Sequence, residues 1–143
     1  MSMTYTEMFT QLVRAEIELW NSLDRSLLAD AGISLPTYQS LSAIAAGAGS
    51  ARVQDVSDTM LITVGATSKL VDRLERDGLV SRQANPDDRR SSLVRLTDRG
   101  VAVLESAGPL AEKHLASILA PRITESRASE LTDELLSLRG VAS

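Results

Sequence analysis

Residues 62–100 read ITVGATSKLVDRLERDGLVSRQANPDDRRSSLVRLTDRG and combine two different hydrophobic periods. In the first half, residues suited to an inward face recur at helical spacing. They are Val64, Thr67, Leu70, Val71 and Leu74. Thr63 is a natural N-cap, and Gly78 suits the left-handed residue that ends a helix. The segment therefore predicts a helix of about 15 residues.

The second half of this segment predicts a β-hairpin. Residues 79–82 and 92–96 are short alternating runs rich in aliphatic side chains. Between them, residues 85–90 have turn chemistry at one end and two adjacent arginines at the other. Upstream, residues 53–60 predict a short helix, and residues 61–62 leave a tight turn. Helix, turn, helix and hairpin together predict a winged helix-turn-helix.

The exposed face of the predicted helix at 63–77 has the chemistry of a DNA-binding surface. Small residues at its start would allow close approach to base edges, and hydroxyls could bond phosphates or bases. The helix N-terminus also attracts phosphate. Lys69 and Arg73, four residues apart, extend the positive face by one turn. For Lys69 or Arg73 alone, a solvated helix face is an equal alternative, and the adjacent arginine-tipped hairpin favours DNA.

Arg89 and Arg90 stand at the tip of the predicted hairpin. A slim arginine-bearing hairpin suits the narrow minor groove, whose negative potential attracts guanidinium groups. Asp88 could orient Arg90, or an arginine of the helix, through a charge-assisted fork. A polar loop with cancelling charges is the alternative if the tip is considered alone. The predicted DNA-binding residues are Thr63, Gly65, Ala66, Thr67, Ser68, Lys69, Arg73, Arg82, Arg89, Arg90, Ser91 and Ser92.

Two adjoining motifs connect the helix end to the hairpin. The helix ends in LERDGLV at residues 74–80, and the hairpin carries D-x-R-x-x-x-V-x-L-T at residues 88–97. Together they resemble the wing signature of the MarR family of bacterial transcriptional regulators, with motif detail over residues 35–100. The resemblance implies a homodimer that places a recognition helix in each major groove and a wing in the minor groove of a palindromic operator.

Composition and charge fit this interpretation. The 143 residues permit one compact domain, or a small domain with dimerisation arms, and 43% apolar with 24% charged residues is ordinary for a globular protein. Residues 52–100 carry a net charge of +1, although the whole chain carries −4. We therefore expect modest non-specific binding and a strong salt dependence. The four aromatic residues are too few for base stacking of single strands.

Several other chemistries find no support in the sequence. There is no cysteine, so disulfides and thiolate metal sites are excluded. The single histidine, His114, argues against a zinc site or a catalytic triad and is expected on a helix surface or interface. No long apolar run or basic-then-apolar start is present. We expect a cytoplasmic protein without cofactor, metal, membrane or enzymatic activity.

The flanking segments predict helices. Residues 4–31 form one long helix whose apolar stripe is longer than a small domain needs, so a partner is expected to cover it. The stripe consists of Tyr5, Phe9, Leu12, Leu19, Trp20, Leu23 and Leu27. A second helix spans residues 36–46, with Tyr38, Leu41, Ile44 and Ala45 inward, and residues 47–50 form a flexible joint. After the wing, Thr97 or Asp98 caps a helix that ends before Pro121 and that Gly108-Pro109 should kink or briefly break. A last helix spans residues 126–138.

The sequence thus predicts a mostly α-helical chain with a small β-hairpin wing. Residues 1–47 hold a dimerisation helix and a second helix, residues 48–98 the DNA-binding lobe, and residues 99–143 the C-terminal dimerisation helices. The family resemblance also implies a small aromatic or phenolic anion as effector, for which Arg14, Trp20 and Tyr38 are candidates. Simple core packing of Trp20 and Tyr38 is the stronger alternative.

We interpret the chain as a sequence-specific double-stranded DNA-binding regulator, and as a ligand-responsive repressor. The ligand would shift the dimer away from the half-site spacing that binding requires. The main alternative is a winged-helix module that binds protein through its hairpin. An enzyme ranks third, because no cluster of catalytic side chains is present in the sequence.

Overall fold

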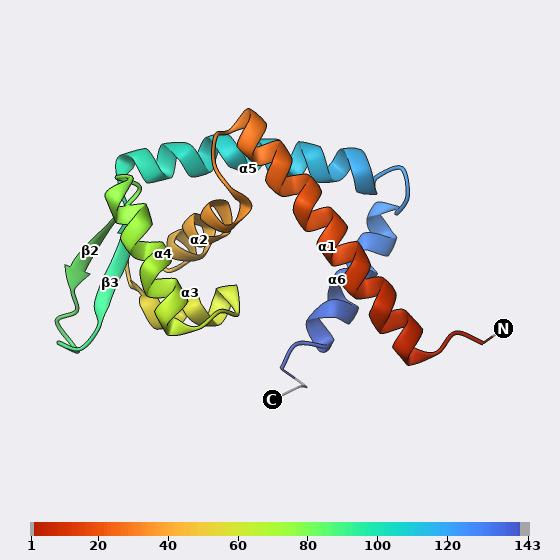
Figure 1. Cartoon of the computed structure of the whole chain (residues 1–143), viewed down its shortest axis with the longest axis horizontal. Helices are drawn as coiled ribbons and strands as arrows, with labels where there is room; N and C mark the ends of the chain where they lie inside the picture. The colour runs from red at the N-terminus through yellow and green to blue at the C-terminus, as the bar shows by residue number, and fades with distance from the viewer. Residues whose placement is uncertain (1, 141–143) are drawn as a thin grey trace. The chain divides into compact units, whose positions relative to one another are not determined.

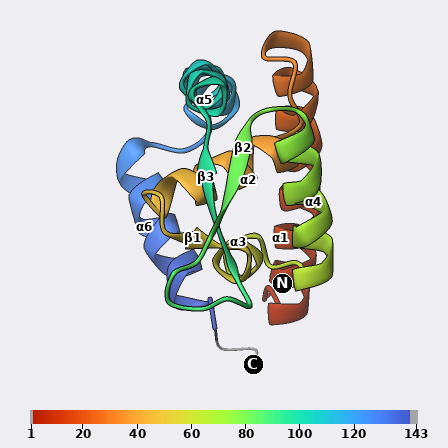
Figure 2. The same cartoon turned by 90° about the vertical axis from the view of Figure 1, so that its left-hand side faces the viewer.

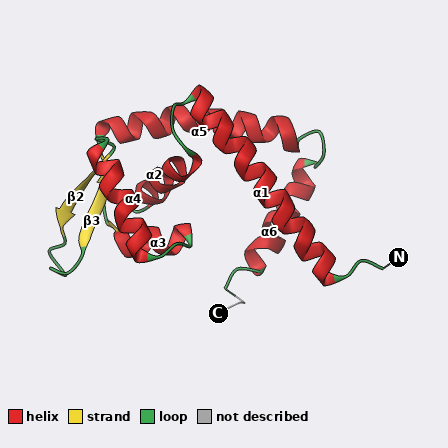
Figure 3. Ribbon diagram, in the orientation of Figure 1, coloured by secondary structure: helices red, strands yellow, loops and turns green. Residues whose placement is uncertain are grey.

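The computed structural model describes residues 2–140, which form six helices and one three-stranded antiparallel sheet (Figures 1 and 3). The chain divides into two compact units, Met1–Ala111 and Glu112–Ser143. Helix α5, Asp98–Leu119, carries the chain from the first unit into the second. The mainly helical architecture with a small sheet confirms the predicted fold class.

Four helices of the first unit precede the hairpin: α1 Tyr5–Asp30, α2 Leu35–Ala46, α3 Val53–Met60 and α4 Val64–Arg76. Three of them begin at a Ser or Thr whose hydroxyl accepts a hydrogen bond from the backbone N–H three residues ahead. These caps are Thr4, Ser34 and Thr63. Such a cap satisfies an N–H group that has no partner inside the helix, which is why each helix begins there.

The sheet consists of β1 Ala51–Arg52, β2 Val80–Ala84 and β3 Ser92–Leu96, in the order β1-β3-β2. Val94 occupies the centre, opposite Arg82 of β2 and Ala51 of β1. The sequence predicted a flexible joint at residues 47–50 and no strand directly after it, so β1 was not predicted. Two residues are too few to show strand alternation in a sequence, and β1 exists only because β3 pairs with it.

One hydrophobic core joins the elements around the helix-turn-helix. Its buried members are Leu41, Ile44, Val56, Val71, Leu74, Leu79, Val80 and Val94. They come from α2, α3, α4, the connection to β2 and the two hairpin strands, so the same side chains fix both α4 and the hairpin. Figure 2 shows the hairpin face-on with α4 beside it. This shared core makes α4 and the wing one rigid support.

Glycine at position 100 allows the exit of the hairpin to pack against its entrance. A Cβ at Gly100 would overlap the backbone oxygen of Leu79. Thr97 joins the same place, because its hydroxyl donates to the Gly78 carbonyl at 2.6 Å and its backbone N–H donates to the Leu79 carbonyl at 3.0 Å. The Thr97 hydroxyl also accepts from the Gly100 N–H at 3.1 Å, which makes Thr97 the cap of α5. These contacts close the base of the hairpin.

Several sequence expectations are corrected by the structure. Ala45 is exposed rather than inward, while Leu41 and Ile44 are buried as predicted. Pro109 lies inside α5 without breaking it. The α1 stripe needs no such correction, because Leu23 and Leu27 are buried while Tyr5, Phe9 and Leu12 are exposed, as expected of a stripe longer than the domain needs. Its burial by a partner stays a prediction.

The second unit contains the end of α5 and helix α6, Glu125–Ser137, which Thr124 caps. No described residue of α6 is buried, and Leu131, Leu135 and Leu136 are among its exposed apolar side chains. An exposed apolar face of this size is expected to find a partner.

Candidate nucleic-acid interface

Helix α4 presents one continuous exposed face along its length. Val64 and Ser68 lie one turn apart on this face, as do Gly65 and Lys69. Val64, Gly65 and Lys69 are exposed and Ser68 is half-buried. Arg73 continues the exposed face toward the helix end. The face therefore begins with small and apolar residues and becomes cationic from its second turn onward.

Thr67 lies on the opposite face of α4, so its predicted contact with DNA is wrong. Its side chain is fully buried, and its hydroxyl donates to the Thr63 carbonyl at 2.9 Å. The helical period of the sequence already predicted an inward position for Thr67. Thr63 remains exposed, but its hydroxyl is used as the acceptor of the helix cap.

The turn between α3 and α4 is fixed by hydrogen bonds across it. The Ser57 hydroxyl donates to the Ile62 carbonyl at 2.6 Å, and the Ile62 N–H donates to the Ser57 carbonyl at 3.4 Å. Leu61 takes the left-handed conformation, with φ of 55°, and its side chain is 83% exposed. The turn thus places an apolar side chain in solvent directly before α4.

The guanidinium of Arg82 in β2 is directed at α4, and its predicted contact with DNA stays a prediction. Nη1 of Arg82 lies 2.8 Å from a carboxylate oxygen of Asp72, and Nη2 donates to the Ser68 carbonyl at 3.2 Å. The Arg82 backbone N–H donates to Glu75 at 3.1 Å. With its side chain only 28% exposed, Arg82 joins the wing to the recognition helix rather than facing outward.

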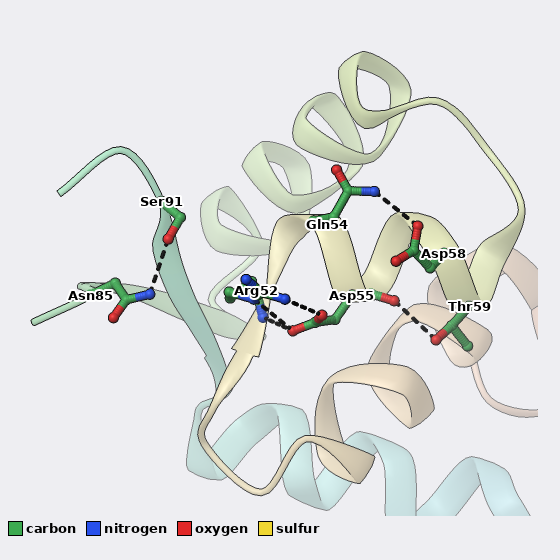
Figure 4. Close-up of polar contacts among 7 residues, drawn as sticks. All are labelled: Arg52, Gln54, Asp55, Asp58, Thr59, Asn85 and Ser91. Carbon is green, nitrogen blue, oxygen red and sulfur yellow. Dashed lines mark hydrogen bonds and ion pairs between the residues drawn. The ribbon is translucent and has the colours of Figure 1, made fainter. Parts of the chain in front are cut away.

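The tip of the hairpin is built by short-range hydrogen bonds. Asn85 Oδ1 accepts from the Asp87 N–H at 3.0 Å. Figure 4 shows that Asn85 Nδ2 also donates to the Ser91 hydroxyl, at 3.0 Å. Asp88 Oδ1 accepts from the backbone N–H of Arg90 at 2.9 Å. Asp88 therefore orders the backbone that carries Arg90, whereas a fork with a guanidinium was expected.

Arg89 and Arg90 are both exposed at this tip. Within residues 2–140, neither guanidinium has an ion-pair partner. Ser91 and Ser92 are half-buried at the start of β3, and Ser91 already accepts a hydrogen bond from Asn85. The two arginines are thus available for an external anion.

Both views of the chain place the N-terminal end of α4 and the tip of the hairpin at the same end of the first unit (Figures 1 and 2). The start of α4, with its small and apolar residues, and the arginine-bearing tip therefore lie along one side. An α-helix fits the major groove of B-DNA, and arginine suits the minor groove. One surface of this kind can address both grooves of a duplex.

Sequence reasoning did not identify Arg52 as part of this region. Its guanidinium donates to Asp55 at 3.0 and 3.3 Å, and its backbone N–H donates to Asp55 at 2.9 Å (Figure 4). These bonds, first from the side chain and then from the backbone, hold the pKa of the Asp55 carboxyl below its usual value. In the sequence, only the spacing of three residues between Arg52 and Asp55 at the start of α3 indicated this pair.

The three candidate effector residues do not surround one hollow. Trp20 lines a hollow of about 260 Å³ with Glu16, Ile17 and Asn21. Arg14 is exposed elsewhere on α1, and Tyr38 is half-buried with its hydroxyl near Gly108. Within residues 2–140, no group of three or more His, Cys, Asp or Glu side chains could hold a metal ion. None of the helices described there is long and apolar enough to cross a membrane.

A helix-turn-helix followed by an antiparallel wing defines a winged-helix protein. The family model of the MarR family matches residues 31–91, which cover α2, α3, α4 and the hairpin tip. YfiV of Bacillus subtilis (strain 168), an uncharacterised HTH-type transcriptional regulator, is 28% identical over 120 residues, 82% of this chain and 69% of YfiV. MarR of Escherichia coli (strain K12), a multiple antibiotic resistance protein, is 31% identical over 54% of each chain.

Sco3205, a MarR family transcriptional regulator from Streptomyces coelicolor solved in complex with DNA, has a similar structure. Its TM-score is 0.82 at 28% identity, over 94% of this chain and 87% of Sco3205. For three further relatives the match spans only 40–51% of their length. The family-model match, the relatives and the solved structures together support a MarR family transcriptional regulator, and the relatives named here are transcriptional regulators and not enzymes.

Proposed function

We propose that this chain is a repressor that binds a palindromic operator as a homodimer, with α4 in the major groove and the wing in the minor groove. The observation that carries the proposal is the pair of exposed arginines, Arg89 and Arg90, on an ordered tip beside the start of α4. An arginine that lacks a partner in its own chain keeps its hydrogen-bonding capacity for a phosphate or a groove. The solved complex of the relative Sco3205 with DNA supports the same use of the fold.

The proposed contacts of α4 are Thr63, Gly65, Ala66, Ser68, Lys69 and Arg73. Lys69 and Arg73 would neutralise phosphates, and the small residues would permit close approach to the groove floor. Arg82 would hold α4 and the wing in position relative to each other. Asp88 would hold the backbone of the tip. A dimer that covers a promoter needs no further contact to block it, which favours repression.

The homodimer is supported by apolar residues that each unit leaves exposed. On α1 these are Tyr5, Met8, Phe9, Leu12, Val13 and Ile17. On α6 they include Leu131, Leu135 and Leu136. Apolar surface of this extent on terminal helices is typical of a subunit interface. Sedimentation of the chain should give twice the protomer mass, and Phe9→Asp together with Leu12→Asp should shift it toward the protomer.

We also propose that a small aromatic molecule regulates the repressor from the hollow beside Trp20. The carboxylate of Glu16 in this hollow disfavours an anion near that wall, so an anionic effector would have to use the outer, Arg14-bearing part of α1. Trp20 is the only tryptophan of the chain, so quenching of its fluorescence reports binding directly. A set of neutral phenols and phenolic acids that has no effect on this fluorescence or on operator binding would contradict the effector proposal.

Selection of bound duplexes from random DNA tests the repressor proposal. We expect a palindrome with half-sites about one turn apart, bound with an affinity that falls steeply with salt. If no duplex is enriched, or binding hardly depends on salt, the hairpin is a protein-docking surface instead.

A further inference from the structure

The start of α4 is apolar where a DNA-reading helix usually carries hydrogen-bonding side chains. Leu61, Ile62 and Val64, which we call the leading patch, are 83%, 38% and 47% exposed. The residues around them offer few free polar groups. The Thr63 hydroxyl is used by the helix cap, and Thr67 is buried. Lys69, at the end of the second turn, is the one side chain in the first two turns of α4 that could form a bidentate contact with a base, and Arg, Asn and Gln are absent there.

Two features of this segment have no purpose within the protomer. Leu61 holds a left-handed conformation that is unfavourable for a residue with a side chain, yet its side chain contacts mostly solvent. Gly65 lies within a helix, where glycine is unfavourable, although a Cβ there would meet nothing within 4 Å. Neither packing nor backbone conformation requires these residues. Both fit a surface that another molecule approaches closely.

From this arrangement we propose that the leading patch reads the C5-methyl groups of thymines in the major groove. The proposal rests on the DNA-binding function given above and extends it to sequence preference. Thymine is the only base of DNA that presents a methyl group in the major groove, and an apolar side chain is its complement. Val64 leads to Ser68 and Lys69 on the same face, so the patch is continuous with the proposed interface. Each half-site should therefore contain thymine under the first turn of α4.

Replacement of thymine by deoxyuridine in the selected duplex tests this directly, because it removes only the methyl group. Burial of one methyl group corresponds to a factor of about four in affinity, so a symmetric double replacement should weaken binding roughly 16-fold. Fluorescence anisotropy at fixed salt measures the loss. A cytosine at the same position should bind better when it is replaced by 5-methylcytosine.

Variants of the protein assign the effect to the leading patch. Val64→Ala should bind the thymine and uracil duplexes with nearly equal affinity, whereas the control Lys69→Ala should lose affinity for both by the same factor. Leu61→Asn keeps a residue that tolerates the left-handed conformation, so its Tm should not fall while its affinity does. Thermal unfolding of each variant verifies the fold.

The outcomes separate the two proposals. If a salt-sensitive palindrome is selected but its half-sites lack thymine, or uracil binds as well as thymine everywhere, the methyl readout is wrong and the repressor function stands. If no duplex is selected, the DNA-binding function itself fails. If Val64→Ala and Leu61→Asn both retain the full preference for thymine, the methyl groups are read elsewhere and the proposal for the leading patch is overturned.

Discussion

The strands and the tip of the β2–β3 hairpin both carry arginines, but these arginines have opposite surroundings. In the middle of β2, Arg82 contacts Asp72 and the Ser68 carbonyl, and its side chain is largely covered. At the tip, Arg89 and Arg90 are exposed, and within the described residues their side chains form no ion pair. Positive charge alone therefore does not identify a DNA contact. An arginine whose terminal nitrogens are paired within the chain, as those of Arg82 are, holds the fold, and an exposed arginine without an ion pair can bind a ligand.

The largest expected effect breaks the base of the hairpin. Gly100→Ala would force a Cβ against the Leu79 carbonyl, and a backbone atom can yield only if the strand moves. We expect a loss of about 3 kcal/mol in the free energy of unfolding, measured by urea denaturation. The matched control is Gly65→Ala, which meets nothing within 4 Å and should gain up to about 1 kcal/mol. Equal stabilities of the two variants would contradict the close packing at the base.

The next effect concerns the tip. Arg90→Ala should leave the unfolding temperature unchanged, because the Arg90 side chain makes no ion pair within the described chain. Its affinity for the selected duplex should fall roughly 30-fold, or about 2 kcal/mol for the two wings of a dimer. Arg90→Lys keeps the charge but loses the paired N–H donors of the guanidinium, so its affinity should lie between those of the parent and Arg90→Ala. A lower unfolding temperature for Arg90→Ala would mean that the Arg90 side chain stabilises the fold and is not free for DNA.

Arg82→Ala should lower the stability of the fold more than the affinity for DNA, the opposite of Arg90→Ala, and its effect should be smaller. Loss of the bonds to Asp72 and Ser68 should cost about 1–1.5 kcal/mol in the free energy of unfolding. The affinity for the selected duplex should fall only slightly, because Arg82→Ala affects DNA binding only through the orientation of the wing. The double variant Arg82→Ala with Asp72→Ala measures the coupling between the two side chains. Full stability of Arg82→Ala would rule out its positioning role.

The smallest effect concerns Asp55 at the start of α3. Hydrogen bonds from Arg52 lower the pKa of the folded carboxyl below its ordinary 3.8. A lowered folded pKa contributes stability that is present above the unfolded pKa and is lost as the pH falls through the folded pKa. Asp55→Asn should therefore be less stable than the parent near neutral pH, by less than Arg82→Ala. The difference should shrink in titrations below pH 3.8, and a difference that grows with acid would contradict this origin.

The local elements could be predicted from the sequence because their signals are local. Thr63 as N-cap and Gly78 as the left-handed end residue, with φ of 76°, are both confirmed. The span of α3 at residues 53–60 also agrees with its prediction. Caps, glycine conformation and helical period depend on neighbours within a few residues, which a single sequence displays in full.

The surroundings of the arginines could not be predicted, because they are tertiary. Asp72 lies ten positions before Arg82, and only the packing of β2 beside α4 brings them together. The same holds for β1, whose two residues become a strand through pairing with β3. The exposure of Leu61 depends on a left-handed turn that is rare for leucine. Such features arise from the fold and not from a local pattern.

The salt dependence of duplex binding by Arg90→Ala, compared with the parent and with Arg82→Ala, tests the central claim most directly. Counterion release makes the slope of log affinity against log salt a count of the charges that contact DNA. The account predicts a slope shallower by about one to two for Arg90→Ala and an unchanged slope for Arg82→Ala. A parent-like slope and affinity for Arg90→Ala would show that the tip of the wing does not contact DNA.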